Sequence, residues 1–349
     1  EKGIVMEAIR TTEVERRRAA RAATVMSVLG ILILAMLVIS MNTGYIRLAP
    51  LDVLKTFMGA GTDKQELILF DFRLPRIVIS VLIGAGLAVS GCILQGLARN
   101  ALAEPGILGI NSGAGLMVIL FISFYPANSV APVLLLPVLA LVGAGLAAAL
   151  IYVLAFKRDE GLSPTRLVLT GIAVAAGINA AMIVLTIRLD PDRFQFVAAW
   201  LAGNIWGTNW DFVLALLPWL LVLLPFVFRK SNVLNVLHLG EQAAAGLGLM
   251  MEKERFYLLA AAVGLAASCV AVSGGIAFVG LIAPHLARRL VGPRHQHLLP
   301  ASALTGALLL IVADTLGRWL LQPSEIPTGI VVAVIGAPYF LYLLAKAKA

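Results

Sequence analysis

The chain has 349 residues, of which 60% are hydrophobic and only 13% are charged, and its mean hydropathy is +0.95. A soluble globular domain carries about a quarter charged residues, so this composition excludes that class. The formal net charge of +8 would suit nucleic acid, but the basic residues lie in short breaks between apolar runs and do not share one face, which argues against a nucleic-acid-binding patch.

The N-terminal segment 1–23 is basic, and four of its arginines immediately precede the first apolar run: Arg16, Arg17, Arg18 and Arg21. That run, 24–41, is longer than the apolar core of a signal peptide, which would also carry a small-residue cleavage site. We therefore predict an uncleaved first spanning helix. Segment 1–23 is then a basic cytoplasmic extension, and residues 24–349 form a single transmembrane domain.

Ten apolar runs approach the roughly 20 residues that a membrane-spanning helix needs. They predict an all-α integral membrane protein with spans at 24–41, 76–97, 107–124, 131–156, 164–187, 211–228, 255–272, 276–290, 299–320 and 327–345. Small residues allow helices to approach closely, and the second and fourth runs are rich in glycine. These runs contain Gly84, Gly86, Gly91, Gly96, Gly143 and Gly145. A packed bundle of many helices is therefore expected.

The distribution of basic residues predicts the orientation of the chain. With ten spans both termini share one side, and that side holds 19 of the 27 Lys and Arg residues, whereas the other side holds 8. Cytoplasmic loops carry the excess of positive charge, so both termini are expected in the cytoplasm. On the outer side, the segment from Leu189 to Trp210 holds three tryptophans, which favours an interfacial helix there.

Ionisable residues inside the runs are few. A transporter driven by an ion gradient usually carries such residues to bind the coupling ion. Asp314 and Arg318 are four residues apart in the ninth run, which favours a mutual ion pair, with a proton relay through Asp314 as the alternative. We expect His285 to be structural, with its ring hydrogen-bonded near the kink at Pro284. The energy for transport is then expected from another chain.

This sequence does not contain that energy source. It has no G-x-x-x-x-G-K-[ST] loop and no Gly-Lys pair, so no Walker-type phosphate-binding loop is expected. Three of its four histidines lie in cytoplasmic breaks and no nucleophile–base arrangement is visible, so neither an enzyme nor a bound metal or cofactor is predicted. Cys92 and Cys269 lie inside apolar runs and are interpreted as small buried residues.

The cytoplasmic segment 229–253 is too interrupted by polar residues to span a membrane. Val233, Val236 and Leu237 recur at helical spacing, which predicts short amphipathic helices joined at Gly240. The stretch Q-A-A-A-G-L-G that begins at Gln242 matches the E-A-A-x-x-x-G motif of ABC importer permeases, with Gln in place of Glu. Small residues on a short exposed helix can fit a groove of a partner. The alternative is an ordinary interfacial helix.

Several stretches together resemble the FecCD family over about residues 73–344. They are R-L-P-R, G-A-G-L-A-V-S-G-C-I-L-Q-G-L-A-R-N-A-L-A-E-P-G-I-L-G, L-N-V-L-H-L-G-E-Q-A-A-A-G-L-G, and a C-terminal stretch that includes G-L-I-A-P-H, A-D-T-L-G-R and S-E-I-P-T-G. The FecCD family comprises the permease subunits of bacterial ABC importers for iron-siderophores, haem and cobalamin.

The resemblance implies the type II ABC importer fold, with ten helices per subunit and short cytoplasmic coupling helices. It also implies a second permease subunit, identical or not, two cytoplasmic ATPases that use ATP-Mg, and an external substrate-binding protein. The expected location is the bacterial cytoplasmic membrane, and the preferred substrate is a ferric siderophore, with haem and cobalamin as alternatives. An ion-coupled secondary transporter is the competing hypothesis from another class.

The resemblance also assigns roles to residues. It implies that Arg73, Arg76 and Arg318 receive acidic residues of the binding protein, where contact with lipid headgroups is the alternative. It implies a cytoplasmic gate that contains Asn100, Leu102, Pro164 and Thr165, where ordinary loop roles are the alternative. The family pattern has Pro where this chain has Ala101, so that loop is expected to be more flexible. The implied ATPase-coupling residues are Leu239, Gly240, Glu241, Gln242, Ala243, Ala244 and Gly248.

Overall fold

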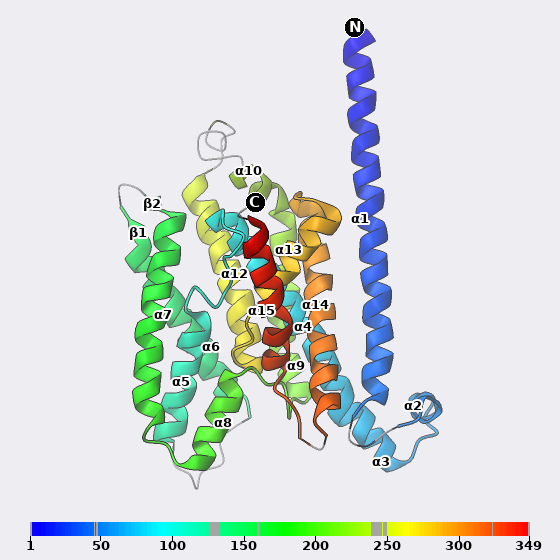
Figure 1. The fold of residues 1–349 in the computed structure, drawn as a ribbon, viewed down its shortest axis with the longest axis vertical. Helices are drawn as coiled ribbons and strands as arrows, with labels where there is room; N and C mark the ends of the chain where they lie inside the picture. The colour runs from blue at the N-terminus through cyan, green and yellow to red at the C-terminus, as the bar shows by residue number, and fades with distance from the viewer. Residues whose placement is uncertain are drawn as a thin grey trace.

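The computed structural model is a bundle of helices that run roughly side by side, with the N-terminal helix extending far beyond one end (Figure 1). The structure describes residues 2–44, 46, 48–125, 133–158, 161–238, 246, 250–322 and 324–347. Ten helices carry the predicted runs: α1 (Lys2–Asn42), α4 (Leu74–Ala98), α5 (Ile110–Phe124), α6 (Leu135–Ala155), α7 (Pro164–Thr186), α9 (Trp210–Arg229), α12 (Met251–Ser273), α13 (Val279–Val291), α14 (His295–Leu320) and α15 (Thr328–Ala347).

The prediction of an all-α membrane protein is confirmed, but the count of ten complete spans is not. Within the described residues, seven helices are long and apolar enough to cross a membrane. Three of the ten fall short: in α15 the apolar stretch is only Thr328–Tyr342, and the helices α5 and α13 are too short, with 15 and 13 residues. Both are shortened at their start by a residue in the left-handed region, Gly109 before α5 and Phe278 before α13. The apolar runs continue through these breaks, and hydropathy does not detect such a change of backbone direction.

Short elements lie at the two ends of the bundle. The predicted interfacial helix is present as α8 (Pro191–Leu201), and the Asp190 side chain caps its first turn. The chain enters α4 through α2 (Pro50–Phe57), α3 (Asp63–Glu66) and a π-helical turn, η1 (Leu67–Arg73). At the end that carries the N-terminus lie α10 (Ser231–His238) and a two-stranded antiparallel sheet, β1 (Phe156–Lys157) with β2 (Gly161–Leu162) (Figure 1).

The centre of the bundle is α4, which packs against α14, α12 and α13. Glycines make this packing possible, as predicted for Gly84 and Gly91. A Cβ atom on Gly91 would lie 1.9 Å from the carbonyl oxygen of Gly280 in α13, and one on Gly84 would lie 2.3 Å from that of Gly306 in α14. No side chain fits at such distances, so the backbones are in direct contact. In contrast, Gly145 has nothing within 4 Å, and the expectation of a close approach there is wrong.

Candidate functional site

One end of the bundle, opposite the N-terminus, contains a buried ion cluster centred on Asp314. Its side chain is fully buried; Oδ1 lies 2.9 Å from Arg76 Nη2 and Oδ2 lies 3.1 Å from Arg318 Nε. Thr328 Oγ1 donates to Oδ1 at 3.3 Å. The predicted pair of Asp314 and Arg318 is confirmed. Because the cluster joins α4, α14 and the start of α15, it fixes three helices to one another.

The three predicted docking arginines all lie at this end but they are turned inward. Arg73, Arg76 and Arg318 are only 6%, 8% and 5% exposed. Arg73 donates to the carbonyl oxygens of Met41 and Ile46, so its guanidinium group holds the chain that follows α1. Arg318 likewise donates to Thr43 O at 3.1 Å and to Ser40 Oγ, at the end of α1. Oxygen atoms of this chain therefore accept the hydrogen bonds of these arginines, and their role in docking a binding protein stays a prediction.

Glu325 joins this cluster, although the sequence reasoning assigned it no role. Its Oε2 lies 2.7 Å from Arg76 Nη1, and its side chain is 33% exposed. Glu325 lies in the segment between α14 and α15, 249 residues from Arg76. Only the fold brings the two together. The outermost partner of Arg76 is therefore a carboxylate of this chain that solvent can reach.

The other end of the bundle contains α10, which leads into the predicted coupling segment. Leu239, Gly240, Glu241, Gln242, Ala243, Ala244 and Gly248 lie outside the described residues. α10 itself has the predicted amphipathic form: Leu234 and Leu237 are buried while Asn232 is exposed. Asn235 Oδ1 accepts from the backbone N of His295 at 2.9 Å, and Gln296 contacts both Asn232 and Asn235. These polar contacts join α10 to the start of α14.

The loop with the predicted gate residues begins at Arg99 and is joined directly to α10. Arg99 ends α4 in the left-handed conformation, with φ of 48°. Its Nη2 donates to the carbonyl oxygen of Leu237, the penultimate residue of α10, at 3.1 Å. Asn100 Oδ1 accepts from Leu102 N at 2.9 Å, which closes a tight turn. Asn100 is thus held by the loop itself.

Glu104 fixes the other half of this loop to α13. Its Oε2 accepts from the backbone N of Phe278, the residue that precedes α13, at 3.1 Å. Burial raises the pKa of the Glu104 carboxyl, and the hydrogen bond from Phe278 opposes that rise. Phe278 has φ of 68°, an unfavourable conformation for a residue with a side chain, so the surrounding contacts must hold it. The second pair of predicted gate residues begins α7, where Pro164 and Leu97 line one small cavity.

His285 lies on α13, facing α15. Its ring packs edge-on against Tyr339, with 6.0 Å between the ring centroids. In the part of the chain that the structure describes, its Nε2 has no hydrogen-bond partner. The His285 ring is therefore held by packing against Tyr339, and its Nε2 does not make the hydrogen bond that we expected near Pro284.

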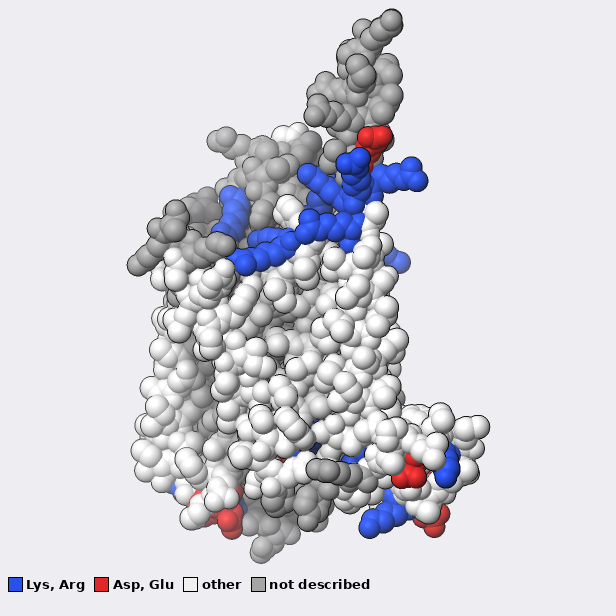
Figure 2. Space-filling view, turned by 45° about the vertical axis from the view of Figure 1, so that its right-hand side comes forward, with Lys and Arg blue, Asp and Glu red and all other residues white. Residues whose placement is uncertain are grey.

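The surface charge separates the two ends of the molecule. Figure 2 shows a belt of lysine and arginine side chains around the end that carries the N-terminus, above a wide uncharged band. The opposite end shows both signs of charge together. An uncharged band between two charged ends is the surface of a protein that crosses a bilayer, and the positive belt is typical of the cytoplasmic side.

Comparison with known proteins supports this interpretation. A sequence model of the FecCD transport family matches residues 31–346. FhuG, the iron(3+)-hydroxamate import system permease of Bacillus subtilis, is 54% identical over 328 residues, which cover 93% of this chain and 97% of FhuG. FecD, the Fe(3+) dicitrate transport system permease of Escherichia coli, is 38% identical over 89% of this chain and 94% of its own length. Among solved structures, a metal-chelate type ABC transporter in an inward-facing conformation superimposes with a TM-score of 0.81 at 32% identity, covering 93% of this chain and 99% of that one.

The helical bundle and the uncharged band between two charged ends define an integral membrane protein, and the matches to permeases of transport systems place it among the membrane permeases. The particular family follows from the matches: the chain belongs to the FecCD transport family.

Proposed function

We propose that this chain is the membrane-spanning permease subunit of an ATP-driven ABC importer, and that its substrate is a ferric siderophore. The observation that carries the proposal is the 54% identity to an iron(3+)-hydroxamate permease along nearly the full length of both chains. Cobalamin and haem are the competing substrates of the same scaffold. Haem is favoured by one relative, the hemin transport system permease HmuU of Yersinia pestis, at 36% identity.

The proposed assembly contains a second permease subunit, two cytoplasmic ATPases and an extracytoplasmic binding protein. ATP-Mg is used by the ATPases, so this chain is not itself the enzyme and holds no cofactor. Both termini face the cytoplasm of a bacterial cell and the protein lies in the cytoplasmic membrane. The belt of positive charge at the N-terminal end supports that orientation (Figure 2).

The contacts of α10 suggest how ATPase movement reaches the permeation path. In this proposal the ATPase is contacted by the segment from Leu239 to Gly248, which directly follows α10. A shift of α10 pulls on Arg99 through the carbonyl oxygen of Leu237, and so on the loop with Asn100 and Leu102. Glu104 passes the same displacement to the start of α13 through Phe278. The gate, which also includes Pro164 and Thr165, then opens or closes with the ATPase.

At the outer end, binding-protein docking is proposed at Arg73, Arg76 and Arg318. Because the three arginines are buried, docking has to compete with contacts within this chain. Arg76 is the best placed, since its outermost partner is the solvent-reachable carboxylate of Glu325. A carboxylate of the binding protein would replace Glu325 and leave Asp314 in place.

Reconstitution tests the function. The purified chain with its partner permease, ATPases and binding protein is placed in liposomes, and uptake of 55Fe-labelled ferric trihydroxamate is followed with and without internal ATP. We expect uptake only with ATP and all components. Uptake by the permease without any ATPase, driven by an ion gradient, would establish the secondary-transporter alternative. Uptake of haem or cobalamin, but not of the iron chelate, would refute the substrate assignment and retain the ABC mechanism.

A further inference from the structure

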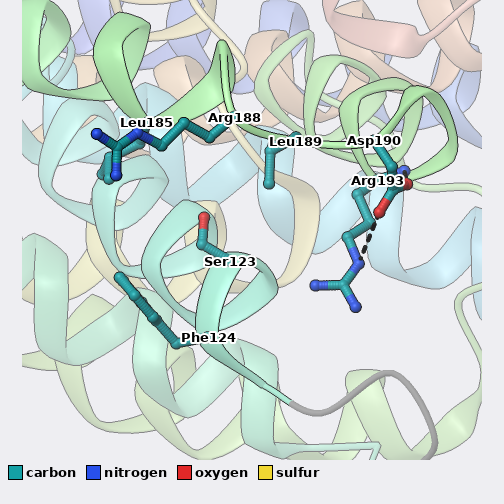
Figure 3. Close-up of a pocket in the computed structure, with 7 residues that line it drawn as sticks. All are labelled: Ser123, Phe124, Leu185, Arg188, Leu189, Asp190 and Arg193. Atoms are coloured by element: carbon teal, nitrogen blue, oxygen red, sulfur yellow. Dashed lines mark hydrogen bonds and ion pairs between the residues drawn. The ribbon is translucent and has the colours of Figure 1, made fainter.

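A cavity of about 160 Å³ lies between the outer ends of α5 and α7 and the start of α8. It is lined by Ser123, Phe124, Leu185, Arg188, Leu189, Asp190 and Arg193, and Figure 3 shows these residues. Since one water occupies about 30 Å³ in the liquid, the cavity has room for a carboxylate or phosphate group. None of these residues belongs to the docking, gate or coupling sets.

The cavity has a net positive charge, because two arginines line it and Asp190 balances only one of them. Arg193 is partly occupied: its Nε lies 3.1 Å from Asp190 Oδ2, and its Nη1 donates to Ile122 O at 2.7 Å. The Arg188 side chain is exposed and makes no hydrogen bond or ion pair to any residue that the structure describes, whereas its backbone N donates to Leu185 O at 3.2 Å. The guanidinium donors of Arg188 are therefore open to solvent or to an anion in the cavity, whereas Arg193 already donates to a carbonyl oxygen.

Ser123 supplies a second, independent sign of a missing partner. Its Oγ is buried and has no hydrogen-bond partner within the described chain. Other buried hydroxyl groups in helices of this protein donate to the carbonyl oxygen four residues earlier, for example Ser302 to Leu298 and Thr305 to Ala301. Buried polar groups are nearly always hydrogen-bonded, so an unsatisfied hydroxyl on a cavity wall calls for a partner. In Figure 3 Ser123 lies between the side chains of Arg188 and Arg193.

We propose that this cavity binds an oxyanion, a carboxylate or a phosphate group, through Arg188, Arg193 and Ser123. The planar guanidinium group matches the geometry of both groups with paired N–H donors. The Ser123 hydroxyl donates a further hydrogen bond to the same oxyanion. Two sources offer this chemistry at the outer end of a membrane protein: a carboxylate on the transported chelate, and the phosphate of a lipid headgroup. The first source rests on the proposed function, and the second does not.

The experiment uses the full assembly and the variant Arg188→Ala/Arg193→Ala, with Arg188→Lys/Arg193→Lys as the conservative variant. Lys55→Ala is the matched control, because α2 lies at the same end of the molecule but outside the cavity (Figure 1). The lipid arm counts phosphatidylglycerol retained by the wild type and each variant in native mass spectrometry. The substrate arm measures the KM for uptake of two ferric trihydroxamates that differ in one carboxylate.

Loss of retained phosphatidylglycerol in the Ala variant alone identifies a lipid phosphate. A rise in KM for the carboxylate-bearing chelate only identifies the carboxylate of the transported chelate as the bound oxyanion. We expect the rise to be at least about tenfold, which corresponds to the loss of one charge-assisted hydrogen bond. If the Lys variant still retains part of the phosphatidylglycerol, or shows a smaller rise in KM than the Ala variant, an anion site is supported, since Lys keeps the charge. If lipid retention and both KM values match those of Lys55→Ala, the proposal is overturned. If the wild type shows no ATP-driven uptake, the proposed function fails, and the lipid arm still decides this proposal.

Discussion

Removal of the Asp314 carboxylate is the most direct test of how the end of the bundle opposite the N-terminus is held together. The variant Asp314→Ala leaves Arg76 and Arg318 facing each other without the anion that lies 2.9 Å and 3.1 Å from them. Removing one partner of a fully buried ion pair costs about 3–5 kcal/mol, because the remaining charge stays out of water. We expect the free energy of unfolding to fall by this amount, and the ends of α4 and α14 to separate.

Glu325→Ala provides the matched comparison. Glu325 contacts the same arginine at 2.7 Å, but its side chain is 33% exposed, so solvent screens the interaction. An exposed ion pair contributes about 0.2–1 kcal/mol. The two variants are therefore expected to differ several-fold in the stability that they lose, although both remove one carboxylate from Arg76.

Unfolding by SDS in mixed micelles measures both losses on the same scale. Asp314→Asn is included because it keeps the shape of the side chain and removes only the charge, so it reports on charge even where the Ala variant does not fold. Equal losses for Asp314→Ala and Glu325→Ala, or a loss below about 1 kcal/mol for Asp314→Asn, would refute the reasoning that burial makes this cluster structural.

Three further predictions follow from the contacts. Arg99→Gly keeps the left-handed backbone but loses the bond to Leu237, so ATP hydrolysis per transported iron should rise as much as in Arg99→Ala; wild-type coupling in the Gly variant would show that only the backbone conformation matters. Gly91→Ala places a methyl group 1.9 Å from an oxygen of α13 and should cost about 3 kcal/mol or more in SDS unfolding, and a loss below about 1 kcal/mol would contradict the close packing. Glu325→Gln keeps an acceptor oxygen but removes the negative charge that competes for Arg76, so it should tighten binding-protein docking by up to about fivefold in surface plasmon resonance, against Glu66→Gln as control; unchanged affinity would remove Arg76 from the docking site.

The positions of the helices were largely predictable, because each apolar run reflects a local property of the chain. The starts of α5 and α13 were not, since Gly109 and Phe278 change the backbone direction inside continuous apolar sequence. Phe278 in particular depends on an acceptor 174 residues away, Glu104. No sequence pattern around Glu104 or Phe278 indicates that the two residues are in contact.

The same division applies to the candidate sites. Helical spacing of four residues was enough to pair Asp314 with Arg318. Motifs singled out the three arginines, which the structure places together at one end of the bundle, but they did not indicate that the side chains turn inward to oxygens of this chain or that Glu325 covers Arg76. The bond from Arg99 to Leu237 likewise joins residues next to two separately predicted sites, the gate that begins at Asn100 and the coupling segment that begins at Leu239.

The sequence by itself determined that this protein folds in a lipid bilayer, where its apolar helices lie along the chain, and that charge differs between the two ends. Hydropathy and charge are properties of single residues, so they can be read without the fold. The tertiary structure decided which charges are buried, which are reachable by solvent and which loops are hydrogen-bonded to each other. Those properties depend on atoms that are far apart along the chain and in contact only after the helices have packed.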